Sequence, residues 1–460
     1  MSKKISQVQE AIIAVNRFGL GARSKELIEA QVNPKQWLLS QMVPPSFDLS
    51  RINTESAFRQ FAIYREEQKR AREITNDSNN KEMVNFSKPL RQTQKKILFD
   101  GFWHSVETTQ PFSVRLLDFF SNHFSVSTSS IPLYTLAPLL EREAIAPFIF
   151  SRFEDMLIAV IQHPAMLIYL DNTKSTGPNS KIGRNNKKRG LNENLAREIF
   201  ELHTLGLDSG YKINDIQELA KAISGWSISY PHEIKKFGFI YRDRQHEPGT
   251  RIILGREYRD LGIQQGRAIL RDLARDPNTA RFISNKLVTY FINDKPDELL
   301  VNDMVDTWIK TKGDLRQVIT TLIEHHKSWD FDRNKFKTPR EFVVSTLRAL
   351  NLNRNISRPF FKSIVYHIAT LGQQPFGSGS PSGYPLKASA WTGSDALMKR
   401  IDWVNRLNAV VPKLKTNTLE IAQQLFGDFI TEQTLRSIKR AESDRQARTL
   451  LFMSPEFQRR

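Results

Sequence analysis

The stretch LNENLAREIFELHTLGLDSGYKINDIQELAKAISGW, residues 191–226, predicts a pair of helices. Apolar residues recur at helical spacing from Leu195 to Leu202, and a second amphipathic pattern runs from Asn214 to Trp226. Two glycines between these patterns are typical helix stops. The stretch therefore predicts a motif helix over 191–205, followed by a short turn and a second helix.

Helix signals of the same kind run along the whole chain. Thr338-Pro339-Arg340-Glu341 is a capping box with proline at the first helical position, and Asp276-Pro277 caps another helix. These signals predict a mainly α, multi-helix, bundle-like globular fold. Further helices are expected over 54–75, 88–106, 111–124, 152–162, 394–411 and 431–451.

One segment has a different pattern. The runs 237–241 and 251–254 are rich in apolar residues, and they flank a polar tip that contains His246-Glu247-Pro248-Gly249. Two such runs around a turn dipeptide are typical of a β-hairpin. We therefore expect a small hairpin near 237–254, inset in the helical protein.

The length of the chain limits the number of domains that it can form. A chain of 460 residues is long enough for two or three domains. The helix signals divide it into an N-terminal helical region (1–110), a central helical region (111–330) and a C-terminal helical region (331–460). The central region holds a basic loop (171–190), the motif helix and the hairpin.

The chain is strongly basic and has no cysteine. Sixty-seven Lys and Arg against 49 Asp and Glu give a formal net charge of +18. Such a charge favours an anionic ligand, an acidic partner protein or nucleic acid, although Lys and Arg also serve simply as solubilising residues. The lack of cysteine excludes disulfides, thiolate nucleophiles, zinc–cysteine sites and iron–sulfur clusters.

Nothing in the sequence predicts a membrane span or an export signal. The first 21 residues lack a long apolar run and a small-residue cleavage site, and no apolar stretch reaches 18 residues. We therefore expect a soluble protein that, as written, stays in the cytoplasm.

The basic loop is a candidate anion site. It leads directly into the start of the motif helix at Asn192, where free backbone N–H groups and the helix dipole favour negative charge. The alternative is an ordinary solvated loop beside a helix cap. The cations of the loop are Lys181, Arg184, Lys187, Lys188 and Arg189.

Acidic side chains of the motif helix are candidates for chemistry. Asn194, Glu198 and Glu201 are predicted on one helix face, flanked by Glu193 and Arg197. Such carboxylates could serve acid–base catalysis, or could hold a divalent metal together with a histidine. A row of surface ion pairs is the alternative.

Three histidines are candidates as well. His123 follows Asn122 and stands between phenylalanines, where burial could tune its pKa, although a satisfied core histidine is the alternative. His203 ends the motif helix, where a protonated imidazole would lie at the negative end of the helix dipole, and this position explains the residue without any chemistry. His246 lies at the predicted hairpin tip, where it could cover a site or simply face solvent.

The signatures of several enzyme classes are missing. The sequence has no phosphate-binding P-loop, no nucleophile elbow, no H-E-x-x-H motif and no dinucleotide fingerprint after a strand. These absences disfavour ATP-driven, dinucleotide-dependent and zinc-peptidase chemistry. No cofactor is indicated, and a divalent metal would rest on carboxylate spacing alone.

Ten segments spread along the chain carry a family resemblance. They are 14–21 (AVNRFGLG), 119–126 (FFSNHFSV), 141–143 (ERE), 162–166 (QHPAM), 177–180 (GPNS), 191–198 (LNENLARE), 203–206 (HTLG), 246–249 (HEPG), 337–342 (KTPREF) and 372–376 (GQQPF). Through these segments the sequence resembles the large bacterial family known as domain of unknown function 1800.

The resemblance covers nearly the whole chain, so it implies one continuous domain over 1–460. Two departures are a Phe119-Phe120 pair, where the family usually has Phe-Trp, and the missing export leader that many members carry. The resemblance thus implies a periplasmic or secreted location as an alternative.

These matching segments are rich in polar side chains, whereas a purely structural scaffold would have its signature on apolar core positions. The leading hypothesis is therefore an enzyme or enzyme-like binder that acts on an anionic substrate by acid–base hydrolysis or elimination. Its pocket would be lined by His123, the motif helix and His246, with His123, Glu198 and His246 as catalytic residues. The substrate-binding residues would be Asn122, Asn179, Lys181, Arg184, Asn192, Asn194, Arg197, Glu201 and His203.

Two other hypotheses remain open. The first is a non-catalytic accessory protein that presents a basic surface to an acidic partner protein or polymer. The second is a nucleic-acid binder, for which Tyr241-Arg242-Asp243-Arg244 is the one stretch that combines an aromatic ring with cations.

Overall fold

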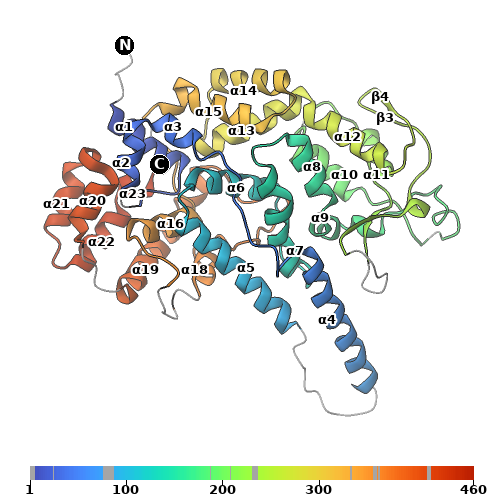
Figure 1. Cartoon of the computed structure of the whole chain (residues 1–460), viewed down its shortest axis with the longest axis horizontal. Coiled ribbons are helices and arrows are strands. Elements are labelled where there is room, and N and C mark those ends of the chain that lie inside the picture. The colour runs from blue at the N-terminus through green and yellow to red at the C-terminus, as the bar shows by residue number, and fades with distance from the viewer. Residues whose placement is uncertain are drawn as a thin grey trace.

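The computed structural model describes residues 6–23, 25–75, 87–186, 188–207, 209–229, 237–331, 334–355, 360, 363–411 and 416–460. Most of this part of the chain is helical, and strands are few and short, so the mainly α prediction is confirmed. In Figure 1 the helices form an elongated body, from which α4 and α5 project side by side.

The helices of the first two regions have the following bounds. The N-terminal region contains α1 (Gln7–Ile13), the π-helical turn η1 (Ala14–Phe18), α2 (Glu26–Val32), α3 (Pro34–Leu39), α4 (Thr54–Thr75) and α5 (Lys88–Glu107). The central region contains α6 (Pro111–His123), α7 (Leu133–Leu140), the π-helical turn η2 (Glu141–Ile145), η3 (Ala146–Phe148), α8 (Phe153–Gln162), α9 (Pro164–Tyr169), η4 (Asn172–Lys174), α10 (Asn194–Glu198), the π-helical turn η5 (Ile199–His203), α11 (Ile213–Ala222), η6 (Asp243–Gln245), α12 (Ile263–Arg275), α13 (Pro277–Phe291), α14 (Glu298–Thr311), α15 (Leu315–Glu324) and η7 (His326–Trp329).

The C-terminal helices gather at one end of the body (Figure 1). One difference from the prediction lies here, because the single helix expected over 431–451 is two helices. The Ser443 hydroxyl accepts a hydrogen bond from the backbone N–H of Gln446, and this N-cap begins a new helix. The elements are α16 (Pro339–Ala349), α18 (Ile364–Thr370), η8 (Ala388–Trp391), α19 (Ser394–Val410), α20 (Thr418–Phe426), η9 (Gly427–Phe429), α21 (Glu432–Lys439), α22 (Asp444–Met453) and α23 (Pro455–Gln458).

Local capping explains where the key helices begin. At the start of α16, the backbone N–H of Thr338 donates to the Glu341 carboxylate at 3.0 Å, and the N–H of Glu341 donates to the Thr338 hydroxyl at 3.3 Å. At the start of α13, Asp276 accepts from the N–H of Asn278 at 2.8 Å. Both caps predicted from the sequence are confirmed.

The strands form two small antiparallel pairs. β1 (Trp226–Ile228) pairs with β2 (Phe239–Tyr241), and β3 (Arg251–Ile253) pairs with β4 (Arg256–Tyr258). Strands therefore lie at both predicted positions, but their predicted pairing with each other is wrong. Leu254 and Gly255 both have positive φ, at 50° and 77°, and they form a two-residue turn that pairs β3 with the chain that follows it.

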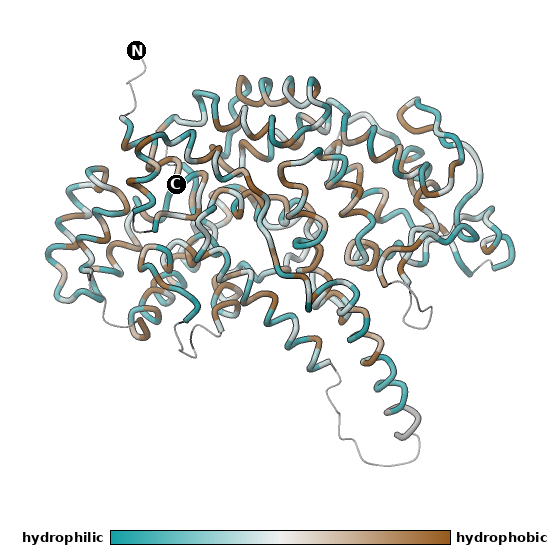
Figure 2. The backbone as a smooth tube through the Cα atoms, in the orientation of Figure 1, coloured by the Kyte–Doolittle hydropathy of each residue, from teal (hydrophilic) through white to brown (hydrophobic). Residues whose placement is uncertain are grey.

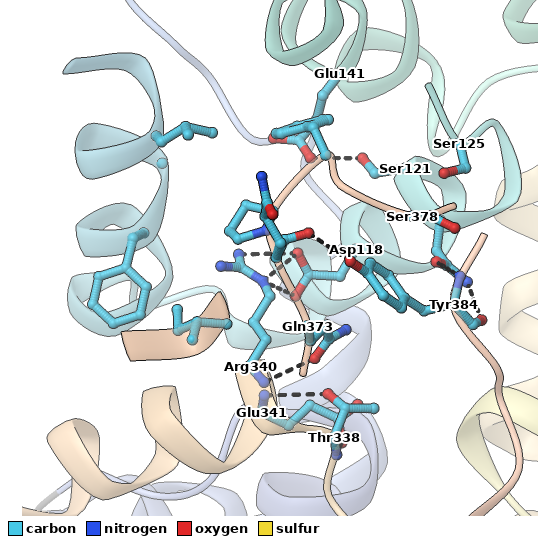
Figure 3. Close-up of a pocket in the computed structure, with 18 of the residues that line it drawn as sticks. Asp118, Ser121, Ser125, Glu141, Thr338, Arg340, Glu341, Gln373, Ser378 and Tyr384 are labelled. Carbon is cyan, nitrogen blue, oxygen red and sulfur yellow. Dashed lines mark hydrogen bonds and ion pairs between the residues drawn. The ribbon is translucent and has the colours of Figure 1, made fainter. Parts of the chain in front are cut away.

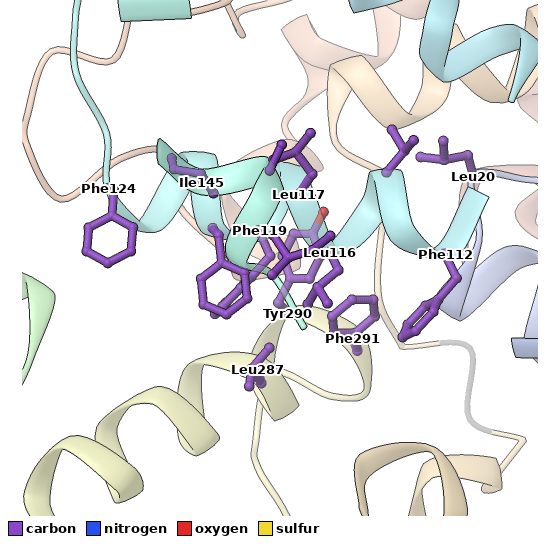
Figure 4. Packing of buried hydrophobic residues seen from close by; sticks show 14 of the residues in the cluster. Leu20, Phe112, Leu116, Leu117, Phe119, Phe124, Ile145, Leu287, Tyr290 and Phe291 are labelled. Atoms are coloured by element: carbon purple, nitrogen blue, oxygen red, sulfur yellow. The ribbon is translucent and has the colours of Figure 1, made fainter. Parts of the chain in front are cut away.

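One hydrophobic core joins all three regions. Most of the buried hydrophobic residues that the structure describes form a single cluster, which contains Phe18, Phe112, Phe291 and Phe457. Figure 4 shows α6 beside α13, with Phe112 and Leu116 facing Phe291. The ring centroids of Phe18 and Phe291 lie 5.7 Å apart. Helix α6 is buried along nearly its whole length, as expected for the central helix of a helical body.

The surface of the body and the projecting helices differ in hydropathy. In Figure 2 hydrophobic segments concentrate in the body, whereas the outer part of α4 is largely hydrophilic. Among the described residues, no helix combines the length and the apolar character that crossing a bilayer requires.

Buried arginines are tied to buried carboxylates. The Glu341 carboxylate accepts from Arg115 at 2.7 Å and from Arg460 at 3.0 Å, and all three side chains are almost completely buried. A second pair joins Arg348 to Glu26 at 2.7 Å. These ion pairs connect segments that lie far apart in the sequence, so they hold α2, α6 and α16 in one arrangement.

Some buried lysines are less well compensated. The Lys337 ammonium donates to the Ser345 hydroxyl at 3.2 Å and lies 4.0 Å from the centre of the Phe457 ring. Burial lowers the pKa of Lys337 to about 7. Burial also lowers the pKa of Lys335 and of Lys286 to about 8 each.

Replacing Lys337 with methionine should raise the free energy of unfolding at neutral pH. An unfolded lysine has a pKa near 10.5, so between about pH 7 and that value the unfolded chain keeps a proton that the folded protein has lost. Stability therefore increases with pH across this window, and Lys337→Met should reduce the increase. Urea denaturation across the window measures the effect, with the exposed Lys310→Met as control. An unchanged pH dependence in Lys337→Met would contradict the assignment.

Candidate functional site

A cavity of about 140 Å³ lies where α5, α6, η2, α16 and α18 meet the loop 373–386. We call it the central cavity (Figure 3). Ile97, Phe102 and Pro138 contribute to an apolar part of its wall, and polar side chains form the rest. This size suits a small organic molecule or a cluster of waters.

Glu141 is a partly buried acid in the wall of the cavity. It follows α7 and begins the π-helical turn η2, an element found frequently at functional sites. Its carboxylate accepts a hydrogen bond from the Ser121 hydroxyl at 2.7 Å. Burial raises the pKa of Glu141, and nearby Asp118 raises it further, although the Ser121 hydrogen bond opposes the shift. The carboxyl group is therefore held toward its neutral form.

Asp118 is the second carboxyl group of the cavity, and its surroundings differ. Both of its oxygens accept from the Nε of Arg340, at 3.1 and 3.2 Å, and a second guanidinium nitrogen lies 3.0 Å from one of them. Arg340 is itself positioned by the hydroxyl of Ser105 and, through its backbone N–H, by the side chain of Gln373. Figure 3 shows this ion pair between Glu141 and the capping box of α16.

Asn122 fastens the loop 373–386 over the cavity. Its side-chain amide donates to the Tyr384 carbonyl at 3.0 Å, and its oxygen accepts from the Tyr384 N–H at 2.7 Å. The loop approaches so closely that a Cβ on Gly383, whose φ is +79°, would lie 2.3 Å from the Asn122 carbonyl oxygen. Asn122, predicted to bind substrate, thus lines the cavity and also holds one of its walls.

His123 and His203, both predicted as site residues, come together in the core. Their ring centroids lie 6.0 Å apart, and both side chains are almost fully buried. The His123 Nδ1 accepts from the Lys286 ammonium at 2.9 Å, so His123 carries its proton on Nε2, which faces the His203 carbonyl oxygen at 3.3 Å. Burial, reinforced by Lys286, holds the pKa of His123 well below its ordinary value and that of His203 at about 3. Sequence reasoning did not single out Lys286.

The acidic residues of the motif helix lie near the surface. Its regular α-helical part, α10, begins at Asn194, and the π-helical turn η5 follows. Arg197 contacts Glu193 at 3.8 Å and Glu201 at 3.3 Å, as in a helix-surface ion-pair row. Burial and neighbouring Glu201 raise the pKa of Glu198. Among the described residues, no three histidine or acidic side chains lie close enough together to hold a metal ion.

His246 is not at an exposed hairpin tip. It follows η6, it is buried, and its Nδ1 lies 3.2 Å from the Ser224 carbonyl oxygen, while Nε2 lies 3.5 Å from Asp260. The predicted tip folds inward because the Ser224 hydroxyl accepts from the N–H of Glu247. The Glu247 carboxylate in turn accepts from the backbone and side-chain N–H groups of Asn179, at 2.7 and 2.6 Å.

The remaining predicted residues lie around the basic loop. Asn192 caps the chain before α10 by accepting from the N–H of Asn194 at 2.8 Å. Lys181 and Arg184 are exposed, and Lys181 lies 3.8 Å from Asp243. Lys187 lies outside the described residues. In the described part of the chain, no hydrogen bond or ion pair joins His123, Glu198 and His246 to one another.

Asp118, Glu141 and Arg340 were missed as site residues, although a signal for them was present. Four segments that carry the family resemblance contribute to the lining of the central cavity: 119–126, 141–143, 337–342 and 372–376. Their convergence could not be deduced from spacing, because they are spread over more than half of the chain.

Comparisons with known proteins bear on the family. No curated protein and no solved structure matches the chain. A family model described as a protein of unknown function, DUF1800, matches residues 13–459, which is nearly the whole chain. The protein therefore belongs to the DUF1800 family.

Proposed function

We propose that the protein is an enzyme, or an enzyme-like binder, that holds a small organic molecule in the central cavity and uses Glu141 for proton transfer. One observation carries this proposal. A carboxyl group that burial holds toward its protonated form lies at the wall of a cavity, opposite polar side chains from distant parts of the chain. Strained or desolvated ionisable groups in cavities are typical of functional sites.

Two of the three carboxyl groups that line the cavity, those of Glu141 and Asp118, suit different roles. The raised pKa of Glu141 favours its protonated form, which can donate a proton, whereas Asp118 is paired with a guanidinium and can stabilise a positive charge that develops on the substrate. This division supports acid–base hydrolysis or elimination as the reaction class. Tyr384 and Gln374 lie on the same wall and could orient the substrate.

The charges of the cavity give less support to an anionic substrate. Two of the three arginines that line it are paired with lining carboxylates, Arg340 with Asp118 and Arg460 with Glu341. The third, Arg142, donates to the Ile97 carbonyl oxygen. A molecule with neutral polar groups and an apolar part therefore fits best. The catalytic roles suggested by the sequence for His123, Glu198 and His246 stay predictions, as do the hypotheses of an accessory protein and a nucleic-acid binder.

Gly101→Phe should abolish ligand binding in the central cavity. Gly101 lines the cavity from α5, and a Cβ there would meet only the Arg142 guanidinium, at 3.6 Å, so a larger side chain extends into the space. A thermal-shift screen with a panel of sugars, carboxylic acids, amino acids and nucleosides should identify compounds that stabilise the wild type. These compounds should leave the melting temperature of Gly101→Phe unchanged.

Gly393→Phe is the matched control, because Gly393 is exposed and nothing lies within 4 Å of a Cβ there. This variant should respond to the same compounds as the wild type. Equal stabilisation of Gly101→Phe and the wild type would rule out the central cavity as the binding site.

A further inference from the structure

A second, larger and more open hollow lies between the basic loop and the β2–η6 segment. We call it the basic cleft; its volume is about 950 Å³, and none of its lining residues lines the central cavity. One wall comes from residues 173–175 and 188–192, and the other from residues 240–245. We propose that the basic cleft binds an oxyanion that carries at least two negative charges, with phosphate-type groups as the chemical class.

The charge of the cleft carries this inference. Its lining has five cations and two acids, and one of these acids, Asp243, lies 3.8 Å from Lys181. Within the described part of the chain, Lys174, Lys188, Arg189 and Arg244 make no ion pair. Like charges held together without counter-ions repel one another, and a multivalent anion relieves that repulsion. The cations are Lys174, Lys188, Arg189, Arg242 and Arg244.

The walls of the cleft are held in place by backbone contacts. The N–H of Gly177 donates to the Gln245 carbonyl at 2.9 Å, and the N–H of Ile182 donates to the Arg244 carbonyl at 3.0 Å. The loop also packs tightly on itself, since a Cβ on Gly183 would lie 2.1 Å from the Gly177 carbonyl oxygen. The backbone segments that carry the cations are thus preorganised, which lowers the entropy cost of binding an anion.

The cleft has few aromatic groups. Tyr241 is the one aromatic side chain in its lining, and its hydroxyl is shielded from solvent beside Gly262, which lies outside the lining. The cleft therefore lacks the stacked rings that bind single-stranded nucleic acid.

Calorimetric titration of the full chain with inorganic tripolyphosphate tests the proposal. The double variant Lys174→Gln/Arg244→Gln removes one cation from each wall, and each removal should weaken binding by about tenfold. Lys310→Gln/Arg440→Gln is the matched control, because it removes one exposed lysine and one exposed arginine outside the cleft. The control should bind as the wild type does.

A parallel arm of the experiment measures binding to phosphatidylcholine vesicles with and without phosphatidic acid. The two arms together distinguish a free phosphate compound from a lipid headgroup as the source of the anion. Cleft-dependent binding in either arm supports the proposal. Equal weakening in both double variants would mean that net charge alone attracts the anion, and this result would overturn it. Absence of binding in both arms would overturn it as well. Because the two sites share no lining residue, failure here leaves the central-cavity proposal standing.

Discussion

Glu341→Ala should lower the free energy of unfolding by about 3–5 kcal/mol, the usual cost of removing one partner from a buried ion pair. Glu341 is the common partner of Arg115 and Arg460, and all three side chains are at most 5% exposed. Its loss leaves two buried guanidinium groups without their counter-ion. It also removes half of the capping box that begins α16.

The pH dependence of this contribution follows from the pKa. Burial raises the pKa of Glu341, but Arg115 and Arg460 more than offset this effect and hold the pKa at about 2, against 4.5 for an ordinary glutamate. A lowered pKa stabilises the fold above about pH 4.5, and the stabilisation is lost as the pH falls toward 2. Chemical denaturation at neutral and acidic pH measures both effects.

Glu55→Ala is the matched control for Glu341→Ala. Glu55 pairs with Arg59 on the exposed face of α4, where both side chains are more than half exposed. A surface pair of this kind contributes less than about 1 kcal/mol. If the two substitutions destabilised the protein equally, the structural role assigned to Glu341 would be wrong.

Glu141→Gln should reduce the proposed activity by about 10²–10⁴-fold, the usual contribution of a positioned general acid. The substitution keeps the shape of the side chain and replaces the ionisable carboxyl group with an amide, which cannot donate its protons as an acid near neutral pH. The measurement is turnover of a panel of p-nitrophenyl esters, phosphates and glycosides by wild type and variant. Glu257→Gln, an exposed change in β4, serves as control and should keep full activity.

Two further results separate catalysis from folding. Because the pKa of Glu141 is raised in the folded state, the protein loses stability as the pH rises from about 4.5 through that raised value. Glu141→Gln has no such loss, so it should be at least as stable as the wild type at neutral pH. The wild-type rate should fall as the pH rises, since deprotonation removes the acid. A Glu141→Gln variant that folds and turns over normally would contradict the proposal.

Much of the helical fold could be predicted, because helix boundaries depend largely on the local sequence. Thr338 and Asp276 cap their helices as expected, and the proline that follows each of them stands at the first helical position. The strand pairing could not be predicted in the same way. It depends on Leu254, a non-glycine residue at positive φ, and on β1, whose first residue, Trp226, was predicted to end a helix.

The candidate site was predictable only in part. Asn122 was singled out, and it lines the central cavity. Asp118 and Glu141 were not singled out. Asp118 pairs with Arg340 and Glu141 with Ser121 through tertiary contacts, which the local spacing of residues does not predict. The sequence pattern favoured Glu198 and Glu201 instead, two carboxylates one turn apart in the motif helix.

One π-helical turn, η2, lies at the site and contributes Glu141 and Arg142 to the central cavity, whereas η1 and η5 lie outside its lining. The three turns η1, η2 and η5 all begin inside or directly after segments that carry the family resemblance. A π-helical turn weakens regular helix hydrogen bonding, and it tends to persist where function requires it. No sequence pattern used here predicts such a turn, which explains why the signal was missed.

The central claim is that burial raises the pKa of the Glu141 carboxyl group, so that it keeps its proton above the pH at which an ordinary glutamate loses it. Infrared difference spectra of the wild type minus Glu141→Gln, recorded across a pH titration, isolate the carbonyl stretch of this single group. The claim predicts that the protonated band persists beyond the ordinary glutamate range and weakens when a cavity ligand binds. A band that disappears at or below pH 4.5, the ordinary glutamate value, would contradict it.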